Sequence, residues 1–278
     1  MMLRVLTACL VSGALCLTAA PVPGQSRYVE LSYPSGGLRI QAYLYKPAGE
    51  GTYPAVIYNH GSRLGRERHS VPFEYIGALL NPAGYVVLVS ERRGYGKSDG
   101  PTWSEDVGNN GARFVARLQD ETNDVLAAVD YLRTLPFVDS RRVGIMGWSF
   151  GGIVTMFAVS RSTVFAGAIN QAGGALTWND NAGVRSALIA AAEKTTTPTL
   201  LLVAENDRTT DSITTLGAIF KKRGIEHRTV IYPPFSTSEQ TFASGPLGHR
   251  LFSAQGVNVW RGDVLEFLAR YLGSGRGV

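Results

Sequence analysis

The sequence predicts an α/β fold, with one mostly parallel central sheet of about eight strands and helices on both faces. Strand-like and helix-like segments alternate along most of the chain, a pattern typical of parallel strands joined by helices. Several strand-like segments, such as 85–89 and 199–204, are continuous apolar runs, as expected for strands that are buried on both faces. A glycine-rich turn at 147–151 joins one strand to a helix, which also fits this class.

Each element has a local signal in the sequence. Strand composition is found at 27–33, 38–45, 55–58, 85–89, 142–146, 165–170, 199–204 and 229–232. The first two strands are expected to pair as a hairpin, because Ser35-Gly36-Gly37 between them is a turn sequence. Helices are expected at 72–80, 115–132, 152–159, 184–194, 211–223 and 257–271. The connection 171–197 is short, so we expect a minimal lid over the sheet.

Composition fits a single domain over residues 25–278. The chain has 278 residues, of which 45% are hydrophobic, so it is long enough to bury a sizeable core. Only 18% of residues are charged, which argues against extended disorder. The net charge of +5 is carried by scattered Lys and Arg, so no nucleic-acid partner is expected. The sequence gives no indication of the oligomeric state.

Residues 1–24 resemble a secretory signal peptide. Arg4 gives a positive start, 6–20 is an uncharged apolar run, and Pro21 and Pro23 end it. We therefore expect export to the periplasm or the extracellular space, without stable membrane association after cleavage. The sequence 6–9 resembles a lipoprotein box, but most of the apolar run follows it, so lipid anchoring is not favoured.

Cysteine chemistry is excluded for the mature chain, because both cysteines, Cys9 and Cys16, lie in the predicted signal peptide. No metal and no organic cofactor is expected. The candidate nucleophile is Ser149, in Gly147-Trp148-Ser149-Phe150-Gly151. Such a sharp strand-to-helix turn exposes the serine oxygen above the sheet edge, and its glycines let strand and helix approach closely.

A serine nucleophile needs a base, and the chain has four histidines. His249 is favoured because it lies in the loop between the last strand and the final helix, where a loop can reach the carboxyl edge of the sheet. His69 and His227 are not near a suitable strand end, and His60 fits a scaffold role better.

Asp207 is the favoured acid, because it follows the strand 199–204 and completes the chain order serine, acid, histidine. Glu205 and Asp211 are alternatives. Glu205 is close to the strand, and Asp211 also suits the first turn of a helix.

An oxyanion hole requires two backbone N–H donors. One is expected from Phe150, and the second from Ser62 in the turn after the third strand, with Gly61 as the alternative. Arg63, Trp103 and Trp178 are candidate substrate contacts, although arginine can equally be structural and tryptophan can be loop packing. Several arginines have the same two interpretations: they could bind an anionic substrate, or they could be structural or solvated. These are the arginines at 63, 66, 68, 92 and 93.

The chain resembles the α/β-hydrolase superfamily, in its dienelactone-hydrolase-like and peptidase-like branch. The matching residues are His60-Gly61, 91–100, 147–152, Asp207 and Gly248-His249. This resemblance implies hydrolysis of esters, lactones or amides. Dienelactone hydrolases carry cysteine at the nucleophile position, whereas this chain has Ser149. The family acid usually follows a glycine-bearing turn, whereas Asp207 follows Ala204-Glu205-Asn206.

The predicted function is serine hydrolysis of a small carboxylic ester or lactone through an acyl-enzyme on Ser149. One alternative is a peptidase or amidase of the same fold. The other is a non-catalytic protein that binds a ligand on a hydrolase scaffold.

Overall fold

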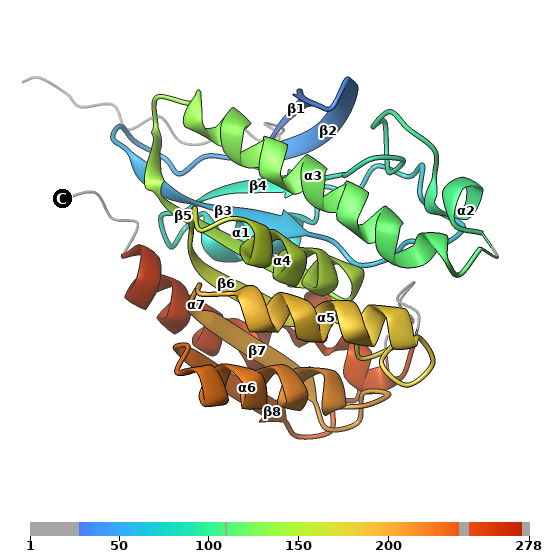
Figure 1. The fold of residues 1–278 in the computed structure, drawn as a ribbon. Coiled ribbons are helices and arrows are strands. Elements are labelled where there is room, and N and C mark those ends of the chain that lie inside the picture. The colour runs from blue at the N-terminus through green and yellow to red at the C-terminus, as the bar shows by residue number, and fades with distance from the viewer. Residues whose placement is uncertain (1–27, 109, 239–244, 274–278) are drawn as a thin grey trace, which may run out of the picture.

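The computed structural model describes residues 28–108, 110–238 and 245–273, and they contain one eight-stranded sheet in the order β1-β2-β4-β3-β5-β6-β7-β8 (Figure 1). The strands are β1 Val29–Ser35, β2 Leu38–Tyr45, β3 Tyr53–Asn59, β4 Val86–Ser90, β5 Val138–Trp148, β6 Phe165–Gln171, β7 Thr199–Ala204 and β8 His227–Tyr232. β2 is antiparallel to both neighbours, and the remaining neighbours are parallel. The predicted fold class is therefore confirmed.

Helices cover both faces of the sheet. They are α1 Glu74–Leu80, α2 Trp103–Asp106, α3 Arg113–Arg133, α4 Phe150–Arg161, α5 Ala182–Lys194, α6 Asp211–Arg223 and α7 Val257–Leu272, with 3-10 helices η1 Leu247–Phe252 and η2 Ala254–Gly256. On one face α3, α4, α5 and α6 pack in a row, and α1 packs with α7 on the other (Figure 1). Every residue of β3, β4 and β7 is buried, because helices cover these strands on both sides.

Several boundaries differ from the sequence expectation. The first predicted helix starts at Glu74 rather than residue 72, because Phe73 has a left-handed φ of 49°. The predicted strand 142–146 is part of a longer strand, Val138–Trp148. α2 was not predicted because its four residues are too few to show a helical period; Thr102 and Glu105 form a capping box that starts it.

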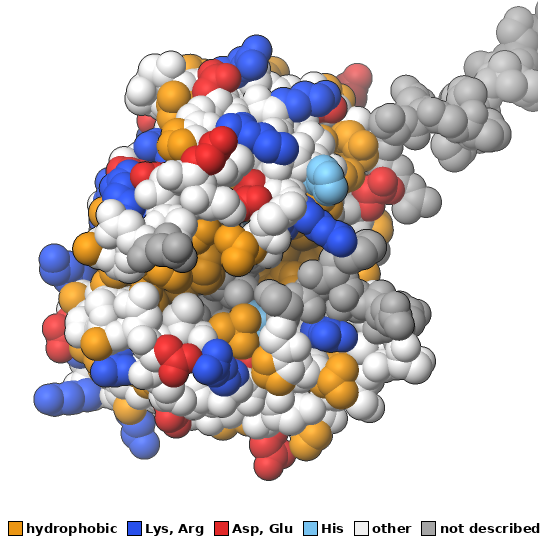
Figure 2. All heavy atoms as spheres, turned by 90° about the vertical axis from the view of Figure 1, so that its right-hand side faces the viewer, with side chains coloured by type: hydrophobic (Ala, Val, Ile, Leu, Met, Phe, Trp, Pro, Cys, Tyr) orange, Lys and Arg blue, Asp and Glu red, His pale blue; other side chains and the backbone are white. Residues whose placement is uncertain are grey.

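The parallel strands place several loops at one edge of the molecule. Their carboxyl ends point toward the right of Figure 1. Figure 2 looks onto this edge, where hydrophobic side chains line a hollow across the face. The turn from β5 to α4, the turn after β7 and the segment from β8 to α7 all begin there. Ligands of open α/β sheets bind at this edge.

The predicted signal peptide 1–24, with Cys9 and Cys16, lies outside the described residues. Among the residues that the structure describes, none of the helices combines the length and the apolar character needed to cross a membrane.

Candidate active site

Ser149 lies in a strained turn between β5 and α4. Its φ of 57° and ψ of −120° are outside the regions that non-glycine residues usually adopt. A Cβ on Gly147 would lie 2.2 Å from the Gly151 carbonyl oxygen, and a Cβ on Gly151 would lie 1.9 Å from the Asn59 oxygen. Both positions therefore require glycine, because backbone cannot easily move away. The strained turn holds the Ser149 side chain beside His249, and Ser149 stays 7% exposed.

His249 lies directly beside Ser149. It occupies η1, and its Nε2 is 2.9 Å from the Ser149 Oγ. Gly248 allows this approach, because a Cβ there would lie 2.4 Å from the Asp207 backbone nitrogen. The sequence predicted a loop at this position, and the structure has a short 3-10 helix in which His249 is 2% exposed.

Asp207 contacts the other side of the imidazole. Its Oδ2 is 2.8 Å from the His249 Nδ1, and its Oδ1 accepts a hydrogen bond from the Arg208 N–H at 2.6 Å. The two alternatives do not fit: Glu205 is exposed, and Asp211 is an exposed residue in the first turn of α6. The structure therefore brings together Ser149, His249 and Asp207 in one hydrogen-bonded line.

This line sets the direction of proton transfer. An ionised carboxylate only accepts hydrogen bonds, so Asp207 favours the tautomer of His249 with the proton on Nδ1. Nε2 then has a free lone pair that accepts the Ser149 hydroxyl proton. This is the arrangement in which a serine becomes a nucleophile, and the carboxylate stabilises the imidazolium that forms.

The two predicted oxyanion donors belong to segments that meet at Ser149: Phe150 follows it in the chain, and Ser62 follows Gly61. Phe150 is the first residue of α4, so its N–H has no acceptor within the helix. Gly61 passes close to the nucleophile, since a Cβ on it would be 3.2 Å from the Ser149 Cβ. Among the described residues, the backbone N–H groups of Phe150 and Ser62 have no backbone acceptor. We expect both N–H groups to face the oxygen of a substrate bound at Ser149.

His60 is a scaffold residue, as expected. It is completely buried, stacks on Phe73 at 5.7 Å and 4°, and its Nδ1 lies 2.7 Å from the Gly61 oxygen. Burial lowers the pKa of His60 well below its ordinary value, and the nearby Arg92 and Arg63 lower it further. The lowered pKa and the packing against Phe73 fit a scaffold role for His60.

The predicted substrate contacts have other partners. Trp103 is 4% exposed, and its ring lies 4.8 Å from those of Phe114 and Phe150, so it supports the residue after the nucleophile. Trp178 is 5% exposed, and its carbonyl accepts a hydrogen bond from Arg185. The Arg63 guanidinium pairs with the buried carboxylate of Glu91. Arg63 therefore offers no free positive charge to a substrate.

Two further residues position the site. The side chain of Asn206 exchanges two 2.9 Å hydrogen bonds with the backbone of Phe235, which joins the acid turn to the segment after β8. The indole N–H of Trp148 donates to the His249 carbonyl at 3.1 Å. Nothing in the sequence marks Asn206, whereas Trp148 stands inside the Gly-x-Ser turn and is adjacent to the nucleophile.

We expect Trp148→Phe to lower kcat about 2- to 10-fold, because it removes a hydrogen bond of ~0.5–1.5 kcal/mol that holds the His249 backbone. Steady-state kinetics on an ester would measure this. Trp260→Phe is the matched control, since its indole donates to Leu251 in the same 3-10 helix at 3.0 Å. An equal loss of kcat in both variants would mean that general loosening of η1, not the bond to His249, is responsible.

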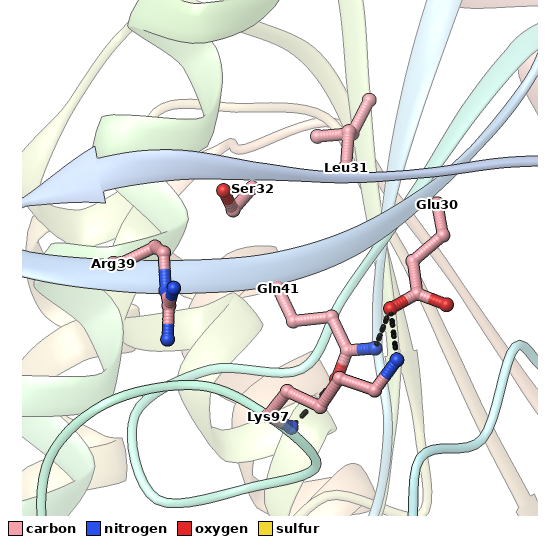
Figure 3. A pocket seen from close by; sticks show the side chains of 6 residues that line it. All are labelled: Glu30, Leu31, Ser32, Arg39, Gln41 and Lys97. Atoms are coloured by element: carbon pink, nitrogen blue, oxygen red, sulfur yellow. Dashed lines mark hydrogen bonds and ion pairs between the residues drawn. The ribbon is translucent and has the colours of Figure 1, made fainter.

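A surface groove of 330 Å³ lies away from these residues. It is lined by Glu30, Leu31, Ser32, Arg39, Gln41 and Lys97 (Figure 3). Its polar groups bind one another: Glu30 accepts hydrogen bonds of 2.7 Å from Lys97 and from Gln41. None of Ser149, His249 and Asp207 lines it, so it is not part of the candidate site.

The fold and this serine–histidine–aspartate line together define an α/β-hydrolase. Comparison with known proteins agrees: a model of the prolyl oligopeptidase family matches residues 73–181, which include Ser149 but neither Asp207 nor His249. Residues 73–181 are thus similar to the prolyl oligopeptidase family, and part of the chain is similar to a protein named as a carboxymethylenebutenolidase, which agrees with the resemblance to the peptidase-like and dienelactone-hydrolase-like branch.

Individual relatives match over part of their length. The quorum-quenching protein AidA of Acinetobacter baumannii is 28% identical over 143 residues, 51% of this chain and 43% of AidA. A Synechocystis protein named as a carboxymethylenebutenolidase is 28% identical over 157 residues, 53% of this chain and 60% of that protein. The acylaminoacyl peptidase of Pyrococcus horikoshii has a TM-score of 0.68 at 21% identity, over 89% of this chain and 42% of the peptidase. The chain thus spans less than two thirds of each.

Proposed function

We propose that the protein hydrolyses a small carboxylic ester or lactone through an acyl-enzyme on Ser149. The observation that carries this proposal is the continuous line from Asp207 Oδ2 to His249 Nδ1, at 2.8 Å, and from His249 Nε2 to Ser149 Oγ, at 2.9 Å. In the first step His249 takes the hydroxyl proton while Ser149 attacks the carbonyl carbon. The backbone N–H groups of Phe150 and Ser62 stabilise the negative oxygen.

The second half of the reaction uses the same groups. The protonated His249 gives its proton to the leaving alcohol, and the carbon–oxygen bond of the ester breaks. Water then enters, His249 removes its proton, and the resulting tetrahedral intermediate releases the acid and restores Ser149. No cofactor is needed for this sequence of steps.

The surroundings of Ser149 favour an apolar acyl group. The ring of Phe150 lies against Trp103 and Phe114, and hydrophobic side chains line the hollow on this face (Figure 2). Leu64, in the turn that carries Ser62, is 68% exposed, and Leu247, in the 3-10 helix that carries His249, is 39% exposed. The carboxymethylenebutenolidase name of one relative also supports a lactone or ester, because a butenolide is a cyclic ester.

A peptidase is the second candidate. Its support is the match to the prolyl oligopeptidase family and the acylaminoacyl peptidase neighbour. A non-catalytic ligand-binding protein is a third reading, and the intact hydrogen-bonded line at Ser149 argues against it.

Substrate panels test the choice. Purified protein would be assayed with p-nitrophenyl esters of increasing acyl length, with lactones and with aminoacyl anilides, using Ser149→Ala as background. We expect kcat/KM for the best ester or lactone to exceed that for the best anilide by at least about 100-fold, because an ester releases a better leaving group. Preference for anilides would support the peptidase, and no turnover of any of them would contradict the proposal.

A further inference from the structure

The turn that carries the Ser62 N–H is attached to the protein core on both sides. On the side of His60, the carbonyl oxygen accepts a 2.9 Å hydrogen bond from Arg92 Nη2. Arg92 is completely buried, and its Nε donates to Glu121 at 2.8 Å. Glu121 is held in turn by Arg117 at 3.1 Å. The backbone just before Gly61 is therefore fixed from inside the molecule.

On the other side, the Arg63 guanidinium binds the Glu91 carboxylate through both of its terminal nitrogens. Glu91 is completely buried and also accepts a 2.7 Å hydrogen bond from the Val71 N–H. The Arg63 guanidinium lies 5.1 Å from the ring centre of Tyr95. A planar, doubly bonded and stacked arginine has one orientation, which a lysine would not reproduce.

The same Arg63 guanidinium also donates from Nη1 to the His69 carbonyl at 2.8 Å, and the Arg66 N–H donates to the Arg63 carbonyl at 2.7 Å, so Arg63 is the residue through which this turn is held. Leu64 is 68% exposed, and Gly65 is exposed with a φ of 76°. An oxyanion donor acts only when it lies about 2.7–3.1 Å from the position of the developing negative oxygen. Without an anchor at Arg63, the flexible glycines on both sides would let the Ser62 N–H leave that position.

We propose that Arg63 and Glu91 are positioning residues that hold the Ser62 N–H in the oxyanion hole; this inference rests on the proposed function. The pair acts through the backbone and does not touch the substrate. It also explains why a carboxylate is buried at Glu91. Burial raises the pKa of Glu91, while Arg63 and the Val71 N–H lower it, so the ion pair offsets the cost of keeping this charge inside the protein.

The test removes the pair without leaving an isolated buried charge. The double variant Arg63→Met/Glu91→Gln is compared with Arg93→Met/Asp124→Asn, which removes another arginine–carboxylate pair. The two pairs are alike in exposure: the side chains of Arg63 and Glu91 are 11% and 0% exposed, and those of Arg93 and Asp124 are 17% and 0% exposed. Arg63→Lys is a milder third variant that keeps the charge.

Four quantities are measured: kcat and KM for an ester, the inhibition constant of a trifluoromethyl ketone, and the rate at which a fluorophosphonate labels Ser149. The ketone forms an adduct whose negative oxygen occupies the oxyanion hole. We expect kcat, ketone affinity and labelling rate to fall together by about 10- to 100-fold in the Arg63→Met/Glu91→Gln variant, less than the ~10²–10³-fold loss in kcat when an oxyanion donor is removed. KM should stay within about 3-fold, and Arg63→Lys should lie in between.

The Arg93/Asp124 variant should change these quantities by less than about 3-fold. The positioning role would be overturned by unchanged ketone affinity and labelling rate in the Arg63→Met/Glu91→Gln variant. An equal fall of these two quantities in the Arg93→Met/Asp124→Asn control would overturn it as well. Failure of the proposed function has a different signature: in that case Ser149 of the unmodified protein would not be labelled. Thermal unfolding of each variant shows whether it is folded, and Arg63→Lys carries the test if the double variant is not.

Discussion

Replacement of Ser149 by alanine is expected to reduce kcat for an ester by about 10⁴- to 10⁶-fold, because no other group can form the acyl-enzyme. The turn holds the Ser149 backbone at φ 57°, and among the residues that the structure describes it is the Ser149 Oγ that lies 2.9 Å from the His249 Nε2. The fold should be unaffected, because alanine is smaller than serine and fits the same turn.

Kinetics and covalent labelling measure this loss independently. A fluorophosphonate should add to Ser149 in the unmodified protein, which mass spectrometry of the labelled peptide would locate, and it should not add to Ser149→Ala. Ser162→Ala is the control, because Ser162 is at the far end of α4 and its hydroxyl accepts a 3.3 Å hydrogen bond from the Val164 N–H. Labelling that persists at another residue of Ser149→Ala would contradict the assignment of the nucleophile.

The sheet could be predicted almost completely from the sequence, because several of its parallel strands are apolar runs and most of these are followed by a helix with a periodic apolar face. Elements too short to show a periodic pattern of hydrophobic residues could not be predicted. α2 has four residues, and η1 is a 3-10 helix of six residues that contains the histidine. α2 begins at a capping box, but its length is too short for a periodic pattern, and η1 packs against β7 and α7, which a single sequence does not display.

The serine, histidine and aspartate could also be predicted, because the α/β plan fixes which strand ends meet at one edge. The ion pairs behind them could not. Arg63 pairs with Glu91, and Arg92 pairs with Glu121, at separations of 28 and 29 residues. In sequence, such an arginine is indistinguishable from a solvated one. The possibility of an anionic substrate therefore remained open at that level, and the structure instead places Arg63, Arg92 and Arg93 in ion pairs with carboxylates.

The role of Asp207 can be tested against a closely matched control, Glu205, which lies two residues before it in the chain. Asp207→Asn keeps the size of the side chain, but its amide nitrogen can donate a hydrogen bond to His249 Nδ1. The imidazole then places its proton on Nε2, where it faces Ser149 and cannot accept the hydroxyl proton. We expect kcat to fall by about 10⁴-fold with little change in KM, as this tautomer change does in serine proteases.

Glu205→Gln removes a charge only two residues away from Asp207, and the exposed side chain of Glu205 has no contact with His249. This control should therefore leave kcat within about 3-fold of the unmodified protein. Steady-state kinetics at neutral pH would measure both variants, and thermal unfolding would show that both are folded. If Glu205→Gln lost activity and Asp207→Asn kept it, the carboxylate that orients His249 during the reaction would be Glu205, reached through a rearranged turn after β7. Asp207 Oδ2 lies 2.8 Å from His249 Nδ1, and its Oδ1 accepts a hydrogen bond from the Arg208 N–H. The turn is therefore already in the arrangement that the reaction requires. We expect Asp207→Asn, and not Glu205→Gln, to lose activity.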